Sequence, residues 1–386
     1  MKDSSIELSK IKSVLVIRLD EIGDVVMTTP FLRELKRNLP NSHITLLVSP
    51  HVYNLVEFCP YVNEVQVYDG HLIKGRLKKA RRCWNAFKFG RQQLRKRKFD
   101  LAVFPRWDAD YYHGAVLAYS SKACWRIGYS KNSTPKKRIF NPHIDRLFTH
   151  VINDDTAKHE VEHNLDILRC LGGVIQEEHL ELWLSPDDEA FAEQLLNSHG
   201  VKRGDLLIAL GPAARASKRR WPLANFVQLG CWLQRQYHAC LVVVGGGGEE
   251  SIGRELERKV DSYVVNTVGR TTLRQTCAIL KRCDLFIGND AGPMHLAAAA
   301  NTPVVEISCH PQFGWPVHAN SPIRFQPWGV CHAILQPEKA LKPCTQACTA
   351  LYPHCIVAVT VDQVKKASMT LLSAIEKSAH FQHRGM

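Results

Sequence analysis

The chain contains no long uninterrupted run of apolar residues. Nowhere do about 18 apolar residues follow one another, so the sequence holds no candidate for a membrane-spanning helix. Residues 1–12 are mixed and charged, and no apolar stretch of the signal-peptide type follows them. We therefore expect a cytoplasmic protein.

Acidic residues are in short supply. The chain has 37 Asp and Glu against 50 Lys and Arg, a net charge of +13, which suits an anionic partner such as nucleic acid, an acidic membrane surface or a phosphorylated small molecule. Charged residues make up 23% of the chain and hydrophobic residues 45%, which excludes general disorder. A chain of 386 residues is long enough for two domains.

Internal repeats of solenoid length are also missing, as is a GxGxxG fingerprint followed by an acidic residue, so neither a solenoid nor a dinucleotide site is expected. Instead, short β-branched runs alternate with helical segments, which predicts an α/β fold with parallel sheets. The pattern loosens between Gly172 and Asp188, where we place the domain boundary. The expected strands are 12–18, 44–48, 65–68, 101–104, 206–210, 240–244, 284–287 and 302–307.

The most informative segment runs from Asp284 to Leu296. An apolar strand ends in Gly-Asn-Asp-Ala-Gly-Pro, and a small-residue helix follows at once. Backbone N–H groups at a helix N-terminus carry partial positive charge and attract phosphate. Asp290 and His295 flank this loop and are expected to add hydrogen bonds to the ligand.

Three other strand ends in the second half carry unusual residues. Small residues from Gly211 lead to Lys218 and Arg219, whose charge suits a diphosphate, although an ordinary helix entry loop would look similar. Four glycines before Glu249 form either a phosphate cradle or a tight turn, and the carboxylate could accept hydrogen bonds from a ribose. The third loop, 267–273, precedes a helix.

The first half offers one carboxylate in a comparable place. Asp24 follows Gly23 after the first strand and is a candidate general base, with Asp20 and Glu21 as competitors. The alternative is that Asp24 only caps a helix. The helical pattern that follows, 25–39, contains Pro30, so the helix begins near Thr29 or is kinked.

Residues Lys74 to Lys98 form a predicted basic helix with interleaved aromatic and leucine residues. Three interpretations stay open: a solvated outer helix, attachment to anionic lipid, and nucleic-acid binding, although no recognised nucleic-acid module surrounds the helix. We expect attachment at the inner face of the cytoplasmic membrane and no nucleic-acid partner.

The 13 cysteines are scattered through both halves, and most are expected to be buried thiols in a reducing compartment. Near the C-terminus Cys344, Cys348 and Cys355 lie close in sequence, with His354 adjacent. A metal site, a local disulfide and packed or free thiols are all compatible with this spacing, although neighbouring His354 and Cys355 would not easily bind one ion together. The sequence assigns no metal ligand.

Taken together, these motifs resemble the heptosyltransferases of lipopolysaccharide core synthesis, glycosyltransferase family nine. Three blocks carry the resemblance in the family's order, and together they cover most of residues 12–310: Val14 to Asp24 with Thr28-Thr29-Pro30, Gly211 to Pro222, and Val268 to Thr271 with Gly288 to Ala298.

The resemblance implies a GT-B fold, two Rossmann-like domains facing across a cleft. We expect an acceptor domain at 1–180, a nucleotide-sugar domain at 181–360, and a helix and tail at 361–386 that could pack back on the N-terminal domain. It also implies inverting, metal-independent transfer from a nucleotide sugar, commonly ADP-heptose, to a lipid-linked or lipopolysaccharide-core acceptor, without a cofactor.

The same resemblance assigns roles to residues. Asp24 is the expected base, and Arg18, Gly23 and Arg106 are predicted acceptor contacts. The predicted donor contacts are Ala213, Lys218, Arg219, Glu249, Gly269, Asp290, Ala291, Gly292 and His295.

Three departures from the family pattern concern the donor. Ala291 stands where a Ser or Thr is usual, Arg219 falls on the usual Lys, and Gly211-Pro212-Ala213 replaces Pro-Gly-Ala. The missing hydroxyl keeps a second interpretation open, a non-catalytic relative that binds a nucleotide or an anionic glycan.

Overall fold

The computed structural model describes residues 6–70, 78–260 and 264–384, and side chains at 78, 79 and 376–384 are not described. The chain divides into two compact units, Met1–His179 and Leu180–Met386. This division lies inside the stretch between Gly172 and Asp188, where the sequence pattern loosens.

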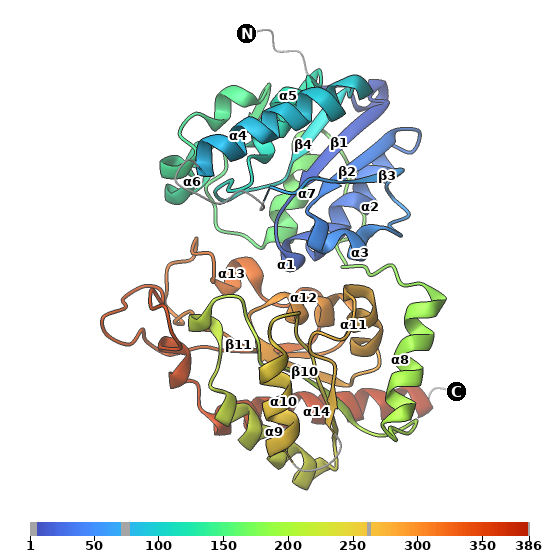
Figure 1. Ribbon diagram of the computed structural model, residues 1–386, viewed down its shortest axis with the longest axis vertical. Coiled ribbons are helices and arrows are strands. Elements are labelled where there is room, and N and C mark those ends of the chain that lie inside the picture. Colours follow the sequence, from blue (N-terminus) through green and yellow to red (C-terminus); the bar gives the residue numbers. More distant parts are fainter. Residues whose placement is uncertain (1–5, 71–77, 261–263, 385–386) are drawn as a thin grey trace. The chain divides into compact units, whose positions relative to one another are not determined.

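The first unit is built on a six-stranded parallel sheet in the order β3-β2-β1-β4-β5-β6. Figure 1 labels β1 to β4 of this sheet. β1 pairs with β2 on one side and β4 on the other, with Val14 opposite both Ile44 and Leu101. The strands are β1 Ser13–Arg18, β2 His43–Val48, β3 Glu64–Val67, β4 Leu101–Phe104, β5 Trp125–Tyr129 and β6 His150–Ile152.

Helices cover the sheet of the first unit. α4 and α5 pack on the face that carries Leu15 and Ile17, whereas α2 packs against α7. The helices are α1 Ile22–Val26, α2 Thr29–Asn38, α3 Tyr53–Val56, α4 Lys78–Phe89, α5 Gly114–Ser121, α6 Pro135–Phe140 and α7 Glu160–Cys170. α2 begins at Thr29 with Pro30 in its first turn, where a missing N–H costs no intrahelical hydrogen bond.

The basic helix is shorter than the sequence predicts. α4 ends at Phe89 and continues as one π-helical turn, Gly90–Leu94, and a 3-10 turn, Arg95–Arg97. Gly90 packs so closely on α5 that a Cβ there would collide with Ser120. The first part of the predicted helix, 74–77, lies outside the described residues.

The second unit repeats the same topology, with a parallel sheet in the order β9-β8-β7-β10-β11-β12. Gly211 pairs with Gly288, and the ring of Phe286 fills the space that a Cβ on either glycine would need. The strands are β7 Leu207–Gly211, β8 Cys240–Val243, β9 Val264–Asn266, β10 Leu285–Asn289, β11 Val304–Ile307 and β12 His332–Leu335.

The C-terminal helix α14, Val361–Arg384, belongs to this second unit. It packs on α9 and on the sheet, and Val364, Leu371 and Leu372 join the core of the unit. The described part of 361–386 is therefore part of the second unit, whereas its packing on the N-terminal domain stays a prediction. The other helices are α8 Pro186–Ser198, α9 Leu223–Tyr237, α10 Glu250–Lys259, α11 Leu273–Leu280, α12 Gly292–Ala299 and α13 Pro322–Phe325.

None of the helices in the described ranges combines the length and apolarity needed to span a bilayer.

Candidate active site

Each sheet has one place where the strand order reverses, between β1 and β4 in the first unit and between β7 and β10 in the second. In open parallel sheets, ligands bind beyond the carboxyl ends of the strands at this switch point. Several of the sequence-predicted residues fall at these two places. Asp24 and Arg106 follow β1 and β4, whereas Arg219 and Asp290 follow β7 and β10.

Asp24 lies in the first turn of α1 and is held by three donors. Its Oδ1 accepts hydrogen bonds from Arg18 Nη2 at 3.2 Å and Arg106 Nη1 at 3.1 Å. Its Oδ2 accepts the backbone N–H of Glu21 at 3.3 Å, as part of a capping box. Asp24 thus takes part in capping α1, as the N3 partner of the N-cap Glu21, and is also the centre of a charged cluster, so a capping role and a catalytic role are compatible.

Further hydrogen bonds hold the two arginines in place. Arg18 is buried and donates from Nη1 to the carbonyl of Pro105 at 2.6 Å. The Arg106 carbonyl accepts Lys137 Nζ at 2.7 Å, and burial lowers the pKa of Lys137 to about 7. Gly23, the third predicted acceptor residue, is buried beside Asp24 in α1.

Asp20 completes the cluster. Its Oδ1 lies 3.2 Å from Arg106 Nη1, and its Oδ2 lies 3.5 Å from Arg18 Nε. Burial raises the pKa of Asp20 to about 6, although both arginines oppose this shift. The sequence identified Asp20 as a competitor of Asp24, and the structure gives it two of the same partners.

In the second unit, the loops after β7 and β10 are joined by an ion pair. Arg219 Nη1 lies 3.4 Å from Asp290 Oδ2, and Asn320 Nδ2 donates to the same oxygen at 3.4 Å. Asp290 is buried, whereas Arg219 is partly exposed.

Asn289, which the sequence analysis did not single out, connects the same two loops. Its Nδ2 donates to the Pro212 carbonyl at 2.8 Å, and its Oδ1 accepts the Trp221 N–H at 3.0 Å. The buried Ala213 follows Pro212, so the small-residue loop is held directly beside the end of β10. In the sequence, Asn289 could have been recognised as a polar residue at the end of an apolar strand, directly before the loop.

The helix after β10 is short, and no side chain caps its N-terminus. Ala291 is the N-cap of α12 and makes no side-chain capping hydrogen bond, and Gly292 opens the helix. His295 is buried one turn further on. The structure therefore brings Asp290, Ala291, Gly292 and His295 into one strand–loop–helix unit, as the sequence predicts.

Glu249 and Gly269 shape the glycine-rich end of β8. Glu249 Oε2 accepts the Gly246 N–H at 3.0 Å, and its Oε1 lies 3.8 Å from Arg220 Nη2. Gly269 has φ +69°, and a side chain there would also meet Glu250. Glu249 thus organises its own loop, and Arg220 is a cation that the sequence analysis missed.

Lys218, another predicted donor contact, has a hydrogen-bond partner elsewhere in the unit. Its Nζ donates to the carbonyl of Cys348 at 2.6 Å, in the segment that carries the C-terminal cysteines. Arg219, not Lys218, is therefore the cation that contacts Asp290.

A buried acid near Asp290 was also missed. Glu306 on β11 is fully buried, and both burial and the charge of Asp290 raise its pKa well above the ordinary value, while Arg219 acts in the opposite direction. In the sequence, Glu306 is a lone acid within an apolar strand.

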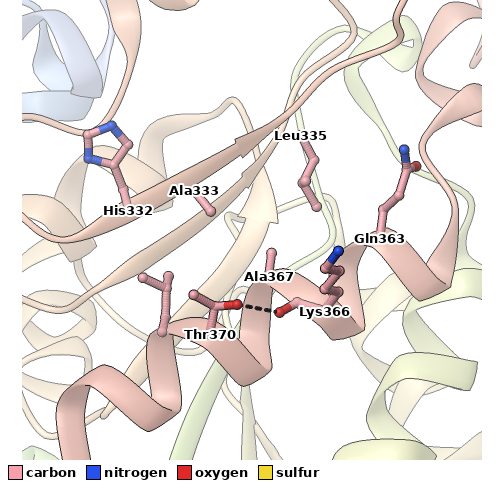
Figure 2. Close-up of a pocket in the computed structure, with 8 residues that line it drawn as sticks. His332, Ala333, Leu335, Gln363, Lys366, Ala367 and Thr370 are labelled. Atoms are coloured by element: carbon pink, nitrogen blue, oxygen red, sulfur yellow. Dashed lines mark hydrogen bonds between the residues drawn. The ribbon is translucent and has the colours of Figure 1, made fainter. Parts of the chain in front are cut away.

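A separate apolar hollow of about 350 Å³ lies between β12 and α14, away from these residues. Figure 2 shows its lining, which includes His332, Leu335, Ala367 and Thr370, with Thr370 donating to the Lys366 carbonyl at 3.0 Å. None of the predicted site residues lines this hollow.

The family model of glycosyltransferase family 9 (heptosyltransferase) matches residues 87–349, more than half of the chain. The chain belongs to this family. Lipopolysaccharide heptosyltransferase 3 of Escherichia coli is 24% identical over 352 residues, which cover 90% of this chain and 98% of that protein.

Solved structures of the family share the fold. A family 9 glycosyltransferase from Veillonella parvula has a TM-score of 0.72 and 22% identity, covering 94% of this chain and 97% of that one. The ADP-heptose lipopolysaccharide heptosyltransferase II of E. coli has a TM-score of 0.69 and 20% identity, covering 94% and 99%. The glycosyltransferase described here therefore has the GT-B fold, with two Rossmann-like domains.

Proposed function

We propose that this family 9 member is an inverting heptosyltransferase that moves heptose from ADP-heptose onto a lipopolysaccharide-core acceptor. The observation that carries the proposal is the placement of a charged cluster at the switch point of each sheet: Asp24 with Arg18 and Arg106 in one unit, Arg219 with Asp290 in the other.

Asp24 is the proposed general base. A carboxylate offers about four lone-pair positions, and the described contacts of Asp24 fill two on Oδ1 and one on Oδ2. One position on Oδ2 remains for the acceptor hydroxyl, whose proton would move there as its oxygen attacks the anomeric carbon. Arg18 and Arg106 would hold the carboxylate in place, and the guanidinium of Arg106, the more exposed of the two, would face acceptor oxygens.

The second unit is the proposed donor site. Negative charge grows on the diphosphate as the bond to the sugar breaks. The guanidinium of Arg219 and the N-terminal amides of α12 at Ala291 and Gly292 are fixed groups that would stabilise this charge. Such groups can replace a divalent cation, so the proposed transfer needs no metal ion in the reaction. The amides survive the change of Ser or Thr to Ala291.

Donor and acceptor are inferred from relatives. The E. coli structural neighbour is named for ADP-heptose, and the curated E. coli relative is a lipopolysaccharide heptosyltransferase. In this chain, Glu249 at the end of β8 is the proposed ribose contact, and His295 the proposed contact to phosphate or sugar.

The basic segment 78–98 is the proposed attachment site for an anionic membrane surface. Arg81, Lys88, Arg91, Arg95 and Lys96 are exposed. Trp84 is 63% exposed and stacks on Phe87 with ring centroids 5.9 Å apart. Exposed cations beside an exposed aromatic ring suit a lipid headgroup region. Sedimentation with anionic and neutral vesicles tests this, and equal binding to both would contradict it.

The transfer itself is tested with purified protein, ADP-heptose and a lipopolysaccharide core that lacks the terminal heptose. We expect ADP release that depends on acceptor, a product heavier by one heptose, and inversion at the anomeric carbon by NMR. Omitting divalent cations from the buffer should leave the rate unchanged. Nucleotide binding without acceptor-dependent ADP release would indicate the non-catalytic alternative.

A further inference from the structure

The segment between β12 and the 3-10 helix Cys355–Ala358 contains no helix or strand, yet two of its thiols and one imidazole converge with the thiol of Cys355. The ligand atoms of Cys344, Cys348, His354 and Cys355 all lie within 4.8 Å of one another. The three cysteines are buried, and all are free thiols. A segment of this length without secondary structure is uncommon in a compact domain and usually has a function of its own or is disordered.

The distances between these ligand atoms match those around a tetrahedral ion. His354 Nδ1 lies 3.6 Å from Cys344 Sγ and 3.4 Å from Cys355 Sγ. Zinc–sulfur bonds of about 2.3 Å and zinc–nitrogen bonds of about 2.0–2.1 Å at a tetrahedral angle place S and N about 3.5 Å apart. These side chains are therefore already spaced as ligands around one ion.

The local backbone makes this convergence possible. His354 has φ −131° and ψ −85°, neither helical nor extended, and this conformation turns the neighbouring His354 and Cys355 side chains toward the same point. His354 and Cys355 can therefore face one ion although they are neighbours in the sequence. Cys344 Sγ also accepts the Thr349 N–H at 3.3 Å, an outer contact of the kind that orients metal-bound thiolates.

A disulfide explains less. It would use two sulfurs and give no reason for a third thiol and an imidazole to lie at the same point. We propose that Cys344, Cys348, His354 and Cys355 form a tetrahedral Zn²⁺ site. Three thiolates and one imidazole fill all four positions, so the ion is structural and has no open position for substrate. Binding displaces the protons of the three thiols.

The metal site would also stabilise the loop after β7, which carries Lys218 and Arg219 of the proposed donor site. The Cys348 carbonyl accepts Lys218 Nζ, and the Val359 carbonyl accepts Trp221 Nε1 at 2.8 Å. The Gln346 carbonyl accepts the Trp315 N–H at 2.8 Å. An ion at the four ligands would thus fix the Cys348 and Val359 carbonyl groups, which position the segment from Lys218 to Trp221.

The first experiment measures metal in the purified full chain by mass spectrometry after exhaustive desalting. We expect about one zinc ion per chain, released when a mercurial titrates the thiols. Replacement of zinc by Co²⁺ in the parental protein should give the d–d bands of tetrahedral cobalt and a thiolate charge-transfer band. These measurements on the parental chain do not depend on whether any variant folds.

Variants then assign the ligands. Cys355→Ser and His354→Ala should lower zinc affinity by more than about 10²-fold, because even outer contacts of zinc sites cost about 10–100-fold. His354→Cys should retain the ion, since four thiolates also suit zinc. Cys283→Ser is the matched control, a buried thiol of the same unit that bonds to the Ile279 carbonyl.

Four results would overturn the proposal: no metal in the parental chain, iron in place of zinc, a disulfide among these cysteines, or metal content that stays the same in Cys355→Ser and His354→Ala. Failure of the heptosyl transfer would leave it intact, because no step of the transfer enters the argument.

Discussion

Arg219 on the loop after β7 lies 3.4 Å from Asp290 on the loop after β10, and this ion pair spans the switch point of the second sheet. Asp290 is only 4% exposed, so one face of the guanidinium is committed to a buried carboxylate. The pair fixes a cation beside the start of α12, where the N–H groups point out of the helix.

Arg219→Ala should weaken ADP binding by about 10–100-fold, because a hydrogen bond to a charged group contributes about 1.5–3 kcal/mol. Titration calorimetry with ADP measures the change. Arg258→Ala is the control, since it removes the same charge from an exposed position on α10. Equal ADP affinity in both variants would remove Arg219 from the donor site.

Asp24→Asn should lower turnover by about 10²–10⁴-fold and leave ADP affinity nearly unchanged. The amide keeps the shape of the side chain but cannot take the proton of the acceptor. Steady-state transfer assays and calorimetry on the same preparation check both expectations. Parental turnover in this variant would mean that another group is the base.

Arg106→Ala tests a positioning role. Arg106 contacts Oδ1 of both Asp20 and Asp24, so its loss should let the Asp24 carboxylate move and lower kcat. If the residue also binds acceptor, KM for the acceptor rises, whereas KM for ADP-heptose stays the same. Arg106→Lys should restore part of kcat by returning the charge without the planar fork. A loss confined to thermal stability would indicate a purely structural role.

Asp20 provides a pH-dependent prediction. Its pKa in the folded protein, about 6, lies above the ordinary 3.8. Folding therefore favours the protonated acid, and its contribution to stability is complete below about pH 4 and lost as the pH rises through about 6. The total change is about 3 kcal/mol, from about 1.4 kcal/mol per unit of pKa shift.

Asp20→Asn removes this dependence. The Tm of the variant relative to the parental protein should therefore rise between about pH 4.5 and about pH 7.5. Thermal unfolding followed by circular dichroism at both pH values measures the difference. A constant difference would mean that the pKa of Asp20 is not raised.

The sequence predicts the two parallel sheets because their central strands are continuous apolar runs, such as Val14 to Ile17 and Leu285 to Ile287. It does not predict β5, β6, β9 or β12. Of these, β6, β9 and β12 are edge strands of only three or four residues. Nor does it predict the end of α4 at Phe89, which is decided by the packing of Gly90 on Ser120.

In the candidate site, too, the sequence predicts local features better than contacts made through the tertiary fold. Residues at strand ends, such as Asp24 and Asp290, are recognisable because the chain itself places them beside a helix start. Partners across the sheet are not: Arg106 meets Asp24 only through the pairing of β1 with β4, and Lys218 meets Cys348 only through the tertiary fold. Which lysine or arginine contacts Asp290 is likewise decided by packing.

Glu306→Gln tests the protonation of the buried acid beside Asp290. Because burial and Asp290 raise the pKa of Glu306 well above its ordinary value, the parental side chain should be neutral in acid and a glutamine should replace it with little effect. At about pH 5 we expect the Tm and ADP affinity of the variant to match those of the parental protein.

The raised pKa of Glu306 also predicts how the stability of the variant compares with that of the parental protein at higher pH. The contribution of Glu306 to stability is present below its ordinary pKa and is lost as the pH rises through its pKa in the folded protein. The stability of the variant relative to the parental protein should therefore increase toward alkaline pH. Thermal unfolding of both proteins at about pH 5 and at an alkaline pH measures the change in the difference between their Tm values. If Glu306 were instead ionised and paired with Arg219, the glutamine variant would be less stable and bind ADP more weakly already at about pH 5, since Arg219 would lose a charged partner.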